Sequence, residues 1–160
     1  MKGVYFSLGS NIGDRALNIA RAVEALPAHG ARVVRQSSLY ETEPVELRVQ
    51  DWFLNCVVEV DTQLTPQELM HELLEIERSM GRVRLAPKGP RIIDMDILLF
   101  GTAIVREPRL EIPHPGIAER RFVLVPFAEI APGAIHPLLR KTITELLVET
   151  PDKSEVRLFS

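Results

Sequence analysis

The segment IIDMDILLF, residues 92–100, decides the fold of this chain. Apart from its two aspartates it is apolar, and Gly101 and Thr102 end it, so it is predicted to be a strand. It completes the series strand, helix, strand, strand, helix, strand. That order is typical of the split βαβ or ferredoxin-like fold, an α+β architecture in which an antiparallel βαββαβ sheet carries both helices on one face.

The elements before residue 92 each have a local signal. Apolar and β-branched runs predict strands at residues 4–8, 33–40 and 53–60. Asp14 predicts the N-cap of a first helix that ends near Pro27. Thr65, with Glu68 three residues later, predicts a capping box for a second helix that ends at Gly81.

The segment after residue 101 holds seven of the twelve prolines. It is predicted to be a C-terminal extension of short pieces, with one more helix at residues 142–149. No internal repeat, low-complexity tract or linker divides the chain. Residues 1–160 are therefore expected to form a single domain.

Composition and charge narrow the class of protein. Of the 160 residues, 46% are hydrophobic and 26% are charged, as in a globular domain. The formal net charge of −3 offers no broad attraction to nucleic acid or to an anionic membrane. The N-terminal segment turns polar after Leu8, which is too early for a signal peptide or a membrane span. Cys56, the single cysteine, cannot pair within the chain, so a cytoplasmic location is expected.

Asp94 and Asp96 are the first residues that the fold itself does not require. Two positions apart on a strand, their carboxylates lie side by side on one face and repel each other. A hard cation such as Mg²⁺, shared with phosphate oxygens, would relieve that repulsion. The alternative is a solvent-exposed sheet edge. The alternation places Ile92, Leu98 and Phe100 on the same face, which favours the metal site.

A run of basic residues without an acidic one lies just upstream: Arg78, Arg82, Arg84, Lys88 and Arg91. Guanidinium groups hold phosphate oxygens in pairs, so this run favours an anionic ligand such as a nucleoside triphosphate. The alternative is a solvated charge run. The sequence has neither a Walker A loop nor a G-x-G-x-x-G turn, so the phosphates cannot be cradled in those ways.

Three further features are weaker signals. Phe53 and Asn55, on one strand face, could form a flat slot whose amide reads a heterocycle, although a core Phe beside a strand Asn is common. Residues 9–11, Gly-Ser-Asn, are either a plain turn or a close approach of the backbone to a ligand. His114, flanked by two prolines, is a candidate phosphate contact.

Seven motifs in fixed order make the chain similar to a known family: SLGSN at 7–11, YETEP at 40–44, FLN at 53–55, GRVR at 81–84, GPRIIDMDIL at 89–98, IPHP at 112–115 and RFVLVPFAEIAP at 121–132. Together they resemble the 6-hydroxymethyl-7,8-dihydropterin pyrophosphokinases of folate biosynthesis. The resemblance runs through nearly the whole chain, and GPR-x-x-D-x-D is its most specific element. The chain is expected to be a single catalytic domain that acts as a monomer. The implied reaction moves the diphosphate of ATP to the hydroxymethyl group of the pterin and gives AMP.

The resemblance also implies a role for particular residues. Asp94 and Asp96 would bind two Mg²⁺ ions that bridge ATP, and the catalytic residues would be Arg82, Arg91, Asp94 and Asp96. ATP would be bound by Glu77, Arg82, Arg84, Arg91, His114 and Arg120. The pterin would be bound by Thr42, Pro44, Phe53, Asn55 and Phe122, with the two phenylalanines stacked on its faces and Asn55 at its edge.

Two functions of other classes are the alternatives. A non-catalytic ferredoxin-like regulatory module could bind a small molecule, but it would not need the Asp94 and Asp96 pair. An RNA-binding sheet of the RRM type would need surface aromatics on its central strands and a basic face. Neither is visible in the sequence.

Overall fold

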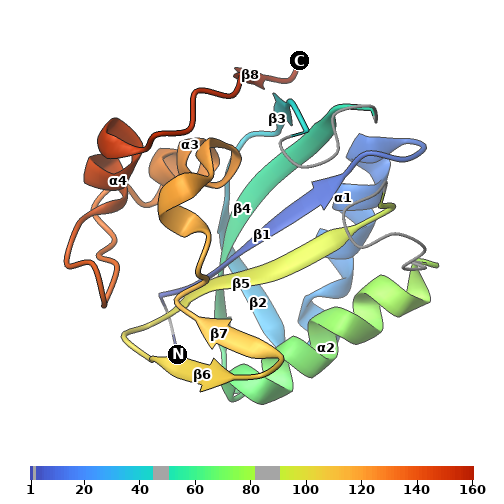
Figure 1. The fold of residues 1–160 in the computed structure, drawn as a ribbon. Helices are drawn as coiled ribbons and strands as arrows, with labels where there is room; N and C mark the ends of the chain where they lie inside the picture. Colours follow the sequence, from blue (N-terminus) through green and yellow to red (C-terminus); the bar gives the residue numbers. More distant parts are fainter. Residues whose placement is uncertain (2, 45–50, 82–90) are drawn as a thin grey trace.

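A six-stranded antiparallel sheet forms the centre of the computed structural model, which describes residues 1, 3–44, 51–81 and 91–160 (Figure 1). Its strands are β1 (Val4–Ser10), β2 (Ala31–Gln36), β3 (Tyr40–Thr42), β4 (Phe53–Thr62), β5 (Asp94–Phe100) and β8 (Val156–Leu158). The order is β5-β1-β4-β3-β8, with β2 also paired to β4. The order β5-β1-β4-β2 within it is that of a ferredoxin-like sheet, so the predicted fold is confirmed.

The predicted strand at residues 33–40 is wrong as one element, because the chain divides it into β2 and β3. Both pair with β4, β2 alongside its second half and β3 alongside its first. Between them Ser37 turns its side chain to the backbone, where its hydroxyl accepts from Val57 N at 2.9 Å. A serine that bonds the main chain in this way competes with a regular strand.

The two predicted helices, α1 (Arg15–Ala25) and α2 (Pro66–Ser79), lie on one face of the sheet (Figure 1). Asp14 caps α1 by accepting from Leu17 N at 3.1 Å. The capping box of Thr65 and Glu68 is complete at the start of α2. Both N-terminal signals in the sequence are therefore confirmed.

The C-terminal extension packs on both faces of the sheet, with its hairpin in the core beside α1 and α2 and its helices on the opposite face. It consists of the hairpin β6 (Val105–Glu107) and β7 (Leu110–Ile112), the short helix η2 (Ile117–Glu119), and helices α3 (Arg121–Ile130) and α4 (Ile143–Glu149). The sequence predicted α4 but not α3, because Pro126 lies inside α3 and lacks a backbone donor. Burial of Val123, Leu124 and Phe127 against the sheet stabilises α3 in spite of this proline.

The sheet thus has an apolar core on each side. Phe6, Leu8 and their neighbours pack against α1 and α2, and Tyr5 and Val57 pack against α3. A register shift between β1 and β5 changes the alternation near Leu98. Leu98 therefore shares the face of the aspartates, as predicted, but Phe100 packs in the opposite core.

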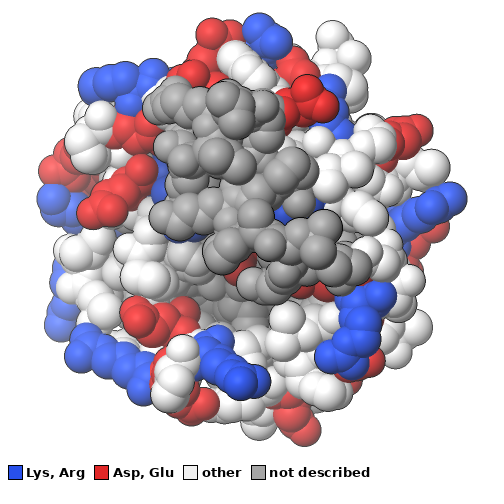
Figure 2. All heavy atoms as spheres, turned by 45° about the vertical axis from the view of Figure 1, so that its right-hand side comes forward, with Lys and Arg blue, Asp and Glu red and all other residues white. Residues whose placement is uncertain are grey.

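The surface fits the small net charge. In Figure 2 basic and acidic side chains are interspersed over the described part of one face, and do not separate into a basic and an acidic area. Within residues 1, 3–44, 51–81 and 91–160, no helix has the length and hydropathy needed to cross a bilayer.

Candidate active site

A pocket lies between the sheet and the start of α3, on the face opposite α1 and α2. It collects most of the residues that the sequence singled out. Those present in its walls are Thr42, Pro44, Phe53, Asn55, Arg91, Asp94, Asp96, His114, Arg120 and Phe122. They come from β3, β4, β5 and the C-terminal extension, which are far apart in the sequence.

Two small residues of β1 leave room for the pocket. Ser7 is opposite Asp96 of β5, and Gly9 is opposite both Asp94 of β5 and Asn55 of β4. The carboxylates and the amide therefore lie on either side of a strand whose own side chains are short. The sequence left Gly9 open between a turn and a close approach, and the structure places it inside β1.

The Asn55 side chain is buried and fixed from two directions. Its Oδ1 accepts from the Thr42 hydroxyl at 2.5 Å, and its Nδ2 donates to Leu8 O at 3.5 Å. A Cβ added to Gly9 would lie 2.6 Å from Asn55 Nδ2. Asn55 can therefore occupy this place because position 9 has no side chain, and it presents an oriented amide to the pocket.

Arg91 and Asp94 form an ion pair at the start of β5. Arg91 Nη1 lies 3.4 Å from Asp94 Oδ2. The backbone of Arg91 is fixed by Asn11, whose Oδ1 accepts from Arg91 N at 2.7 Å and whose own N donates to Arg91 O at 3.0 Å. Asn11 is buried, and sequence reasoning did not assign it this positioning role.

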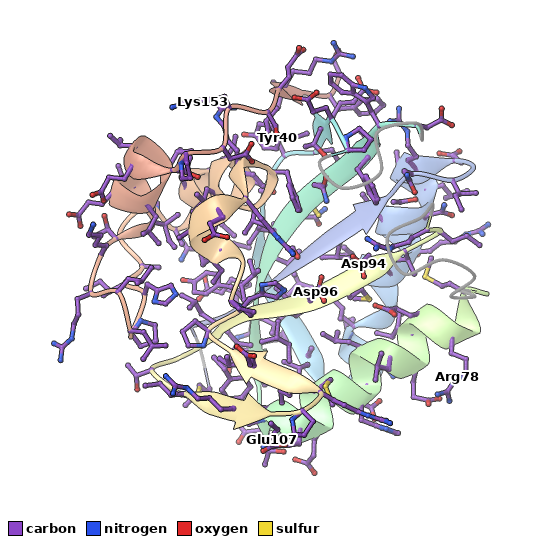
Figure 3. All side chains as sticks on the ribbon, viewed as in Figure 1. Tyr40, Arg78, Asp94, Asp96, Glu107 and Lys153 are labelled. Carbon is purple, nitrogen blue, oxygen red and sulfur yellow. The ribbon has the colours of Figure 1, made fainter. Side chains whose placement is uncertain are left out.

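Asp94 and Asp96 both rise from β5 beside β1, as the two-residue spacing predicts (Figure 3). Among the described residues, no three His, Cys, Asp or Glu side chains are grouped to hold a metal ion. Two carboxylates are the protein ligands that Mg²⁺ commonly has when water and phosphate oxygens complete its shell. The donor set therefore fits Mg²⁺ bound together with a phosphate ligand.

His114 enters the pocket as a neutral side chain. Its backbone N donates to Leu98 O at 2.9 Å, and its Nδ1 accepts from Gly116 N at 3.0 Å. Burial, together with the nearby Arg120 guanidinium, lowers the pKa of His114 to about 4, and Asp94 opposes this shift. With Nδ1 as an acceptor, the ring hydrogen is on Nε2, which can donate one hydrogen bond to a ligand.

Arg120 packs closely against the turn before α3. A Cβ on Gly116 would lie 2.5 Å from Arg120 Nε, so the arginine crosses the turn where a side chain is missing. Its guanidinium carbon lies 5.8 Å from the centre of the Phe122 ring. The same pocket wall thus offers a cation and an aromatic ring.

Glu77 lies outside this pocket, in the wall of a second hollow that adjoins it. It is buried between α2 and β5, where its Oε2 accepts from Met95 N at 2.8 Å. This contact links the helix to the strand that carries both aspartates. Arg82 and Arg84, also predicted to bind ATP, lie outside the described residues.

A second and wider hollow adjoins the first, between α2 and the β6–β7 hairpin. Asp96 and His114 belong to the walls of both hollows. Sequence reasoning missed the residues that complete it, among them Met70, Leu74, Arg109 and Glu111. The sequence signal for this second hollow is the presence of apolar residues outside the buried stripe of α2. Leu74, with 39% of its surface exposed, is one of them.

Comparisons with known proteins identify the family of this chain. The family model described as 7,8-dihydro-6-hydroxymethylpterin-pyrophosphokinase (HPPK) matches residues 5–132. The 2-amino-4-hydroxy-6-hydroxymethyldihydropteridine pyrophosphokinase of Methylorubrum extorquens is 51% identical over 136 residues, which are 84% of this chain and 86% of that protein. The Bacillus subtilis protein of the same name is 47% identical over 127 residues, or 79% of this chain and 76% of that one.

Longer relatives contain the same region. The folic acid synthesis protein fol1 of Pneumocystis carinii is 40% identical over 151 residues, which are 94% of this chain and 20% of that protein. The wild-type HPPK-DHPS structure of Plasmodium falciparum has a TM-score of 0.74 at 17% identity, covering 91% of this chain and 44% of that one. At this identity the similarity shows the fold.

The family expected from the motifs is thus confirmed by a match over most of the chain, and two of the relatives are of similar length. The regulatory module and the RNA-binding sheet are accordingly set aside. The chain belongs to the 7,8-dihydro-6-hydroxymethylpterin-pyrophosphokinase family.

Proposed function

We propose that this chain transfers diphosphate from ATP, with Mg²⁺, to the hydroxymethyl group of 6-hydroxymethyl-7,8-dihydropterin in tetrahydrofolate biosynthesis. The products are AMP and the pterin diphosphate. The observation that carries this proposal is the arrangement across Gly9, where the oriented amide of Asn55 and the carboxylate of Asp94 flank one open position of β1. A heterocycle read by Asn55 would have its substituent directed toward the phosphate-binding groups.

The pterin occupies the part of the pocket next to β3 and β4. Phe53 and Phe122 cover its two faces, and Asn55 bonds its edge together with the backbone near Thr42. Pro44 closes the side of the slot. Support comes from the shared pocket and from the Thr42–Asn55 bond, which orients the amide before the ligand arrives.

ATP occupies the second hollow and reaches into the first. Asp96 and His114 line both hollows. A triphosphate bound along these two residues would therefore extend from the hollow beside α2 to the pterin slot. Arg91 and Arg120 bind its phosphates from the pocket walls. Arg82 and Arg84, which are not among the described residues, belong to the same set, and Glu77 lies in the wall of the second hollow.

Asp94 and Asp96 hold the two Mg²⁺ ions of the proposed complex. Bound there, the ions would supply positive charge that neutralises the phosphates. Their spacing places both carboxylates on one face of β5, where a cation bound beside them would lower their mutual repulsion. Arg91, 3.4 Å from Asp94, orients that carboxylate toward the phosphates.

In the reaction, the hydroxymethyl oxygen of the pterin forms a bond to the β-phosphorus of ATP. The bond from that phosphorus to the oxygen bridging to the α-phosphate breaks, AMP leaves, and the hydroxyl proton passes to solvent. Neutral His114 donates a hydrogen bond from Nε2 to a phosphate oxygen, while Arg91 and Arg120 stabilise the charge of the transferred group. Positioning and charge stabilisation supply most of the catalysis.

Residues 1–160 act as one catalytic domain, which works as a monomer on small molecules in the cytoplasm. Burial of Cys56, whose pKa burial raises to about 12, agrees with a thiol that takes no part in the reaction.

Product analysis tests this function. The protein is incubated with ATP, Mg²⁺ and the reduced pterin, and the mixture is followed by phosphorus NMR. AMP and a pterin diphosphate should appear in equal amounts. ADP with a pterin monophosphate would refute attack at the β-phosphorus while leaving the metal site in place.

A further inference from the structure

The short strand β3 is held by a different element at each of its three residues. The Tyr40 hydroxyl donates to Glu129 Oε1 of α3 at 2.6 Å, on the pocket face of the sheet. The Thr42 hydroxyl donates to Asn55 of β4. Glu41, between them, points to the opposite face and contacts α1 and β8.

Two arginines enclose the Glu41 carboxylate. Arg157 of β8 donates to Oε1 twice, from Nε at 3.1 Å and from Nη2 at 2.8 Å. Arg15 of α1 lies 3.0 Å from Oε2. Both arginines also reach Trp52, because Arg15 donates to its carbonyl at 2.9 Å and Arg157 lies 4.5 Å from the centre of its ring. These four residues, Arg15, Glu41, Trp52 and Arg157, are called the Glu41 cluster below.

The Glu41 cluster lies one peptide unit away from the pterin slot. Glu41 directly precedes Thr42, and Trp52 directly precedes Phe53, and both following residues line the pocket. Consecutive strand residues point to opposite faces, so the cluster holds β3 and the start of β4 from behind. Moving Glu41 or Trp52 would move the two residues that form the slot.

The C-terminal segment extends this hold along the backbone. Glu43 N donates to Glu155 O at 3.2 Å, and Glu155 N donates to Glu43 Oε1 at 2.9 Å. At the other end, Phe159 N donates to Leu39 O at 3.0 Å. Residues 155–159 thus run along residues 39–43, although they lie beyond residue 132, where the match to the family model ends.

Stability alone is a poor explanation for the contact of Arg157 with Glu41. Arg157 has 56% of its side chain exposed, and exposed ion pairs contribute little to the free energy of unfolding. The guanidinium fork of Arg157, with two donors on Oε1 of Glu41 and an aromatic ring against it, instead fixes geometry. A binding site needs its first contacts held within a fraction of an ångström, and residues behind them supply this.

We propose that the Glu41 cluster is a positioning element of the pterin slot and that Arg157 joins the C-terminal strand to it. This inference rests on the proposed function, since it concerns the same slot. The cluster touches neither substrate. It sets where Thr42 and Phe53 stand, and so acts on the pterin and not on ATP.

The test compares Arg157→Ala, Arg157→Lys and a chain ending at Ser154 with the wild-type protein. Arg157→Ala should raise the KM for the pterin at least fivefold and leave kcat and the KM for ATP within twofold. The truncated chain should show at least the same rise. Lysine should restore part of the affinity, because it keeps the charge but cannot form the fork. Emission of the single tryptophan, Trp52, should shift to the red in Arg157→Ala, which reports loss of the contact.

Arg32→Ala is the matched control, because Arg32 makes an exposed ion pair with Asp61 of β4, 3.1 Å apart and outside the pocket walls. It should change none of the three constants. The inference is overturned if Arg157→Ala leaves the pterin KM within twofold, or if both KM values rise together. Should the shortened chain fail to fold, Arg157→Ala decides alone. Calorimetry of pterin binding gives a readout without turnover, so a wild-type protein that binds pterin but forms no AMP fails the proposed function and not this inference.

Discussion

Gly9 and Asn55 lie opposite each other on β1 and β4, and a Cβ on Gly9 would stand 2.6 Å from Asn55 Nδ2. The Phe53 ring is the next neighbour, 3.5 Å from the same point. The backbone of Gly9 therefore occupies the space between the carboxylates of β5 and the slot on β4. Absence of a side chain at this one position lets the two halves of the pocket meet.

Gly9→Ala should weaken pterin binding about tenfold, because the methyl group displaces an amide that is held at both ends. ATP binding should change less, since the amide lies on the β4 side of Gly9. Calorimetric titration with each ligand measures both effects. Gly133→Ala is the control, because a Cβ there meets nothing within 4 Å. Equal losses for the two ligands would contradict a separate pterin slot.

Asp96→Asn should lower turnover by about 100-fold or more, since an ionised ligand of the metal contributes several kcal/mol in such sites. In EDTA its melting temperature should equal or exceed that of the wild type, because one of two adjacent negative charges is removed. Steady-state kinetics and thermal denaturation test the two parts. Asp61→Asn, on β4 away from the pocket, should keep full turnover. Near wild-type turnover by Asp96→Asn with Mg²⁺ would reject the metal assignment.

Local signals predicted the frame of this structure well. Caps depend on residues three positions apart, and the capping box of Thr65 and Glu68 forms as the sequence indicates. The spacing of Asp94 and Asp96 likewise predicts that both carboxylates lie on one face. Their assignment as ligands of two Mg²⁺ ions, like the division of residues between ATP and pterin, came from the resemblance and stays a prediction.

Other features depend on partners that lie far apart along the chain. The role of Gly9 follows from strand register, and the pair of Glu41 and Arg157 joins residues 116 positions apart. Helix α3 was missed because Pro126 argues against a helix locally, while burial of its neighbours against the sheet is a tertiary effect. Sequence patterns of short range carry none of this information.

His114 should make the protein less stable in mild acid. Burial and Arg120 lower its folded pKa to about 4, below the unfolded value of 6.5. Unfolded chains therefore bind the proton first as the pH falls. The stabilising contribution is complete above pH 6.5 and is lost as the pH falls toward 4, and at pH 4.5 the loss is about 2 to 3 kcal/mol.

Urea unfolding of the wild type and of His114→Asn at pH 7.5 and 4.5 measures the contribution of His114 to stability. The carboxylates titrate in both proteins, so their effect cancels in the comparison. The wild type should lose more stability than the variant between the two pH values. A further consequence is that His114 stays neutral from pH 6 to 8, so the rate should show no inflection from it there. An identical pH dependence in both proteins would mean that His114 titrates normally in the folded state.

Two variants of Glu77 distinguish a structural role of this residue from a role in binding ATP. Its Oε2 is the acceptor for Met95 N, and Met95 stands between the two aspartates of β5. Glu77→Ala leaves this buried amide without that acceptor and should lower the free energy of unfolding by about 1 to 3 kcal/mol. Glu77→Gln keeps a carbonyl oxygen in nearly the same place, so it should retain most of the stability. Because β5 then stays in position, it should also retain most of the turnover.

Urea unfolding and the KM for ATP of both variants decide between the roles. If Glu77→Gln folds as stably as the wild type but raises the KM for ATP tenfold, the negative charge acts on the nucleotide or its metal, and the contact with Met95 is then secondary.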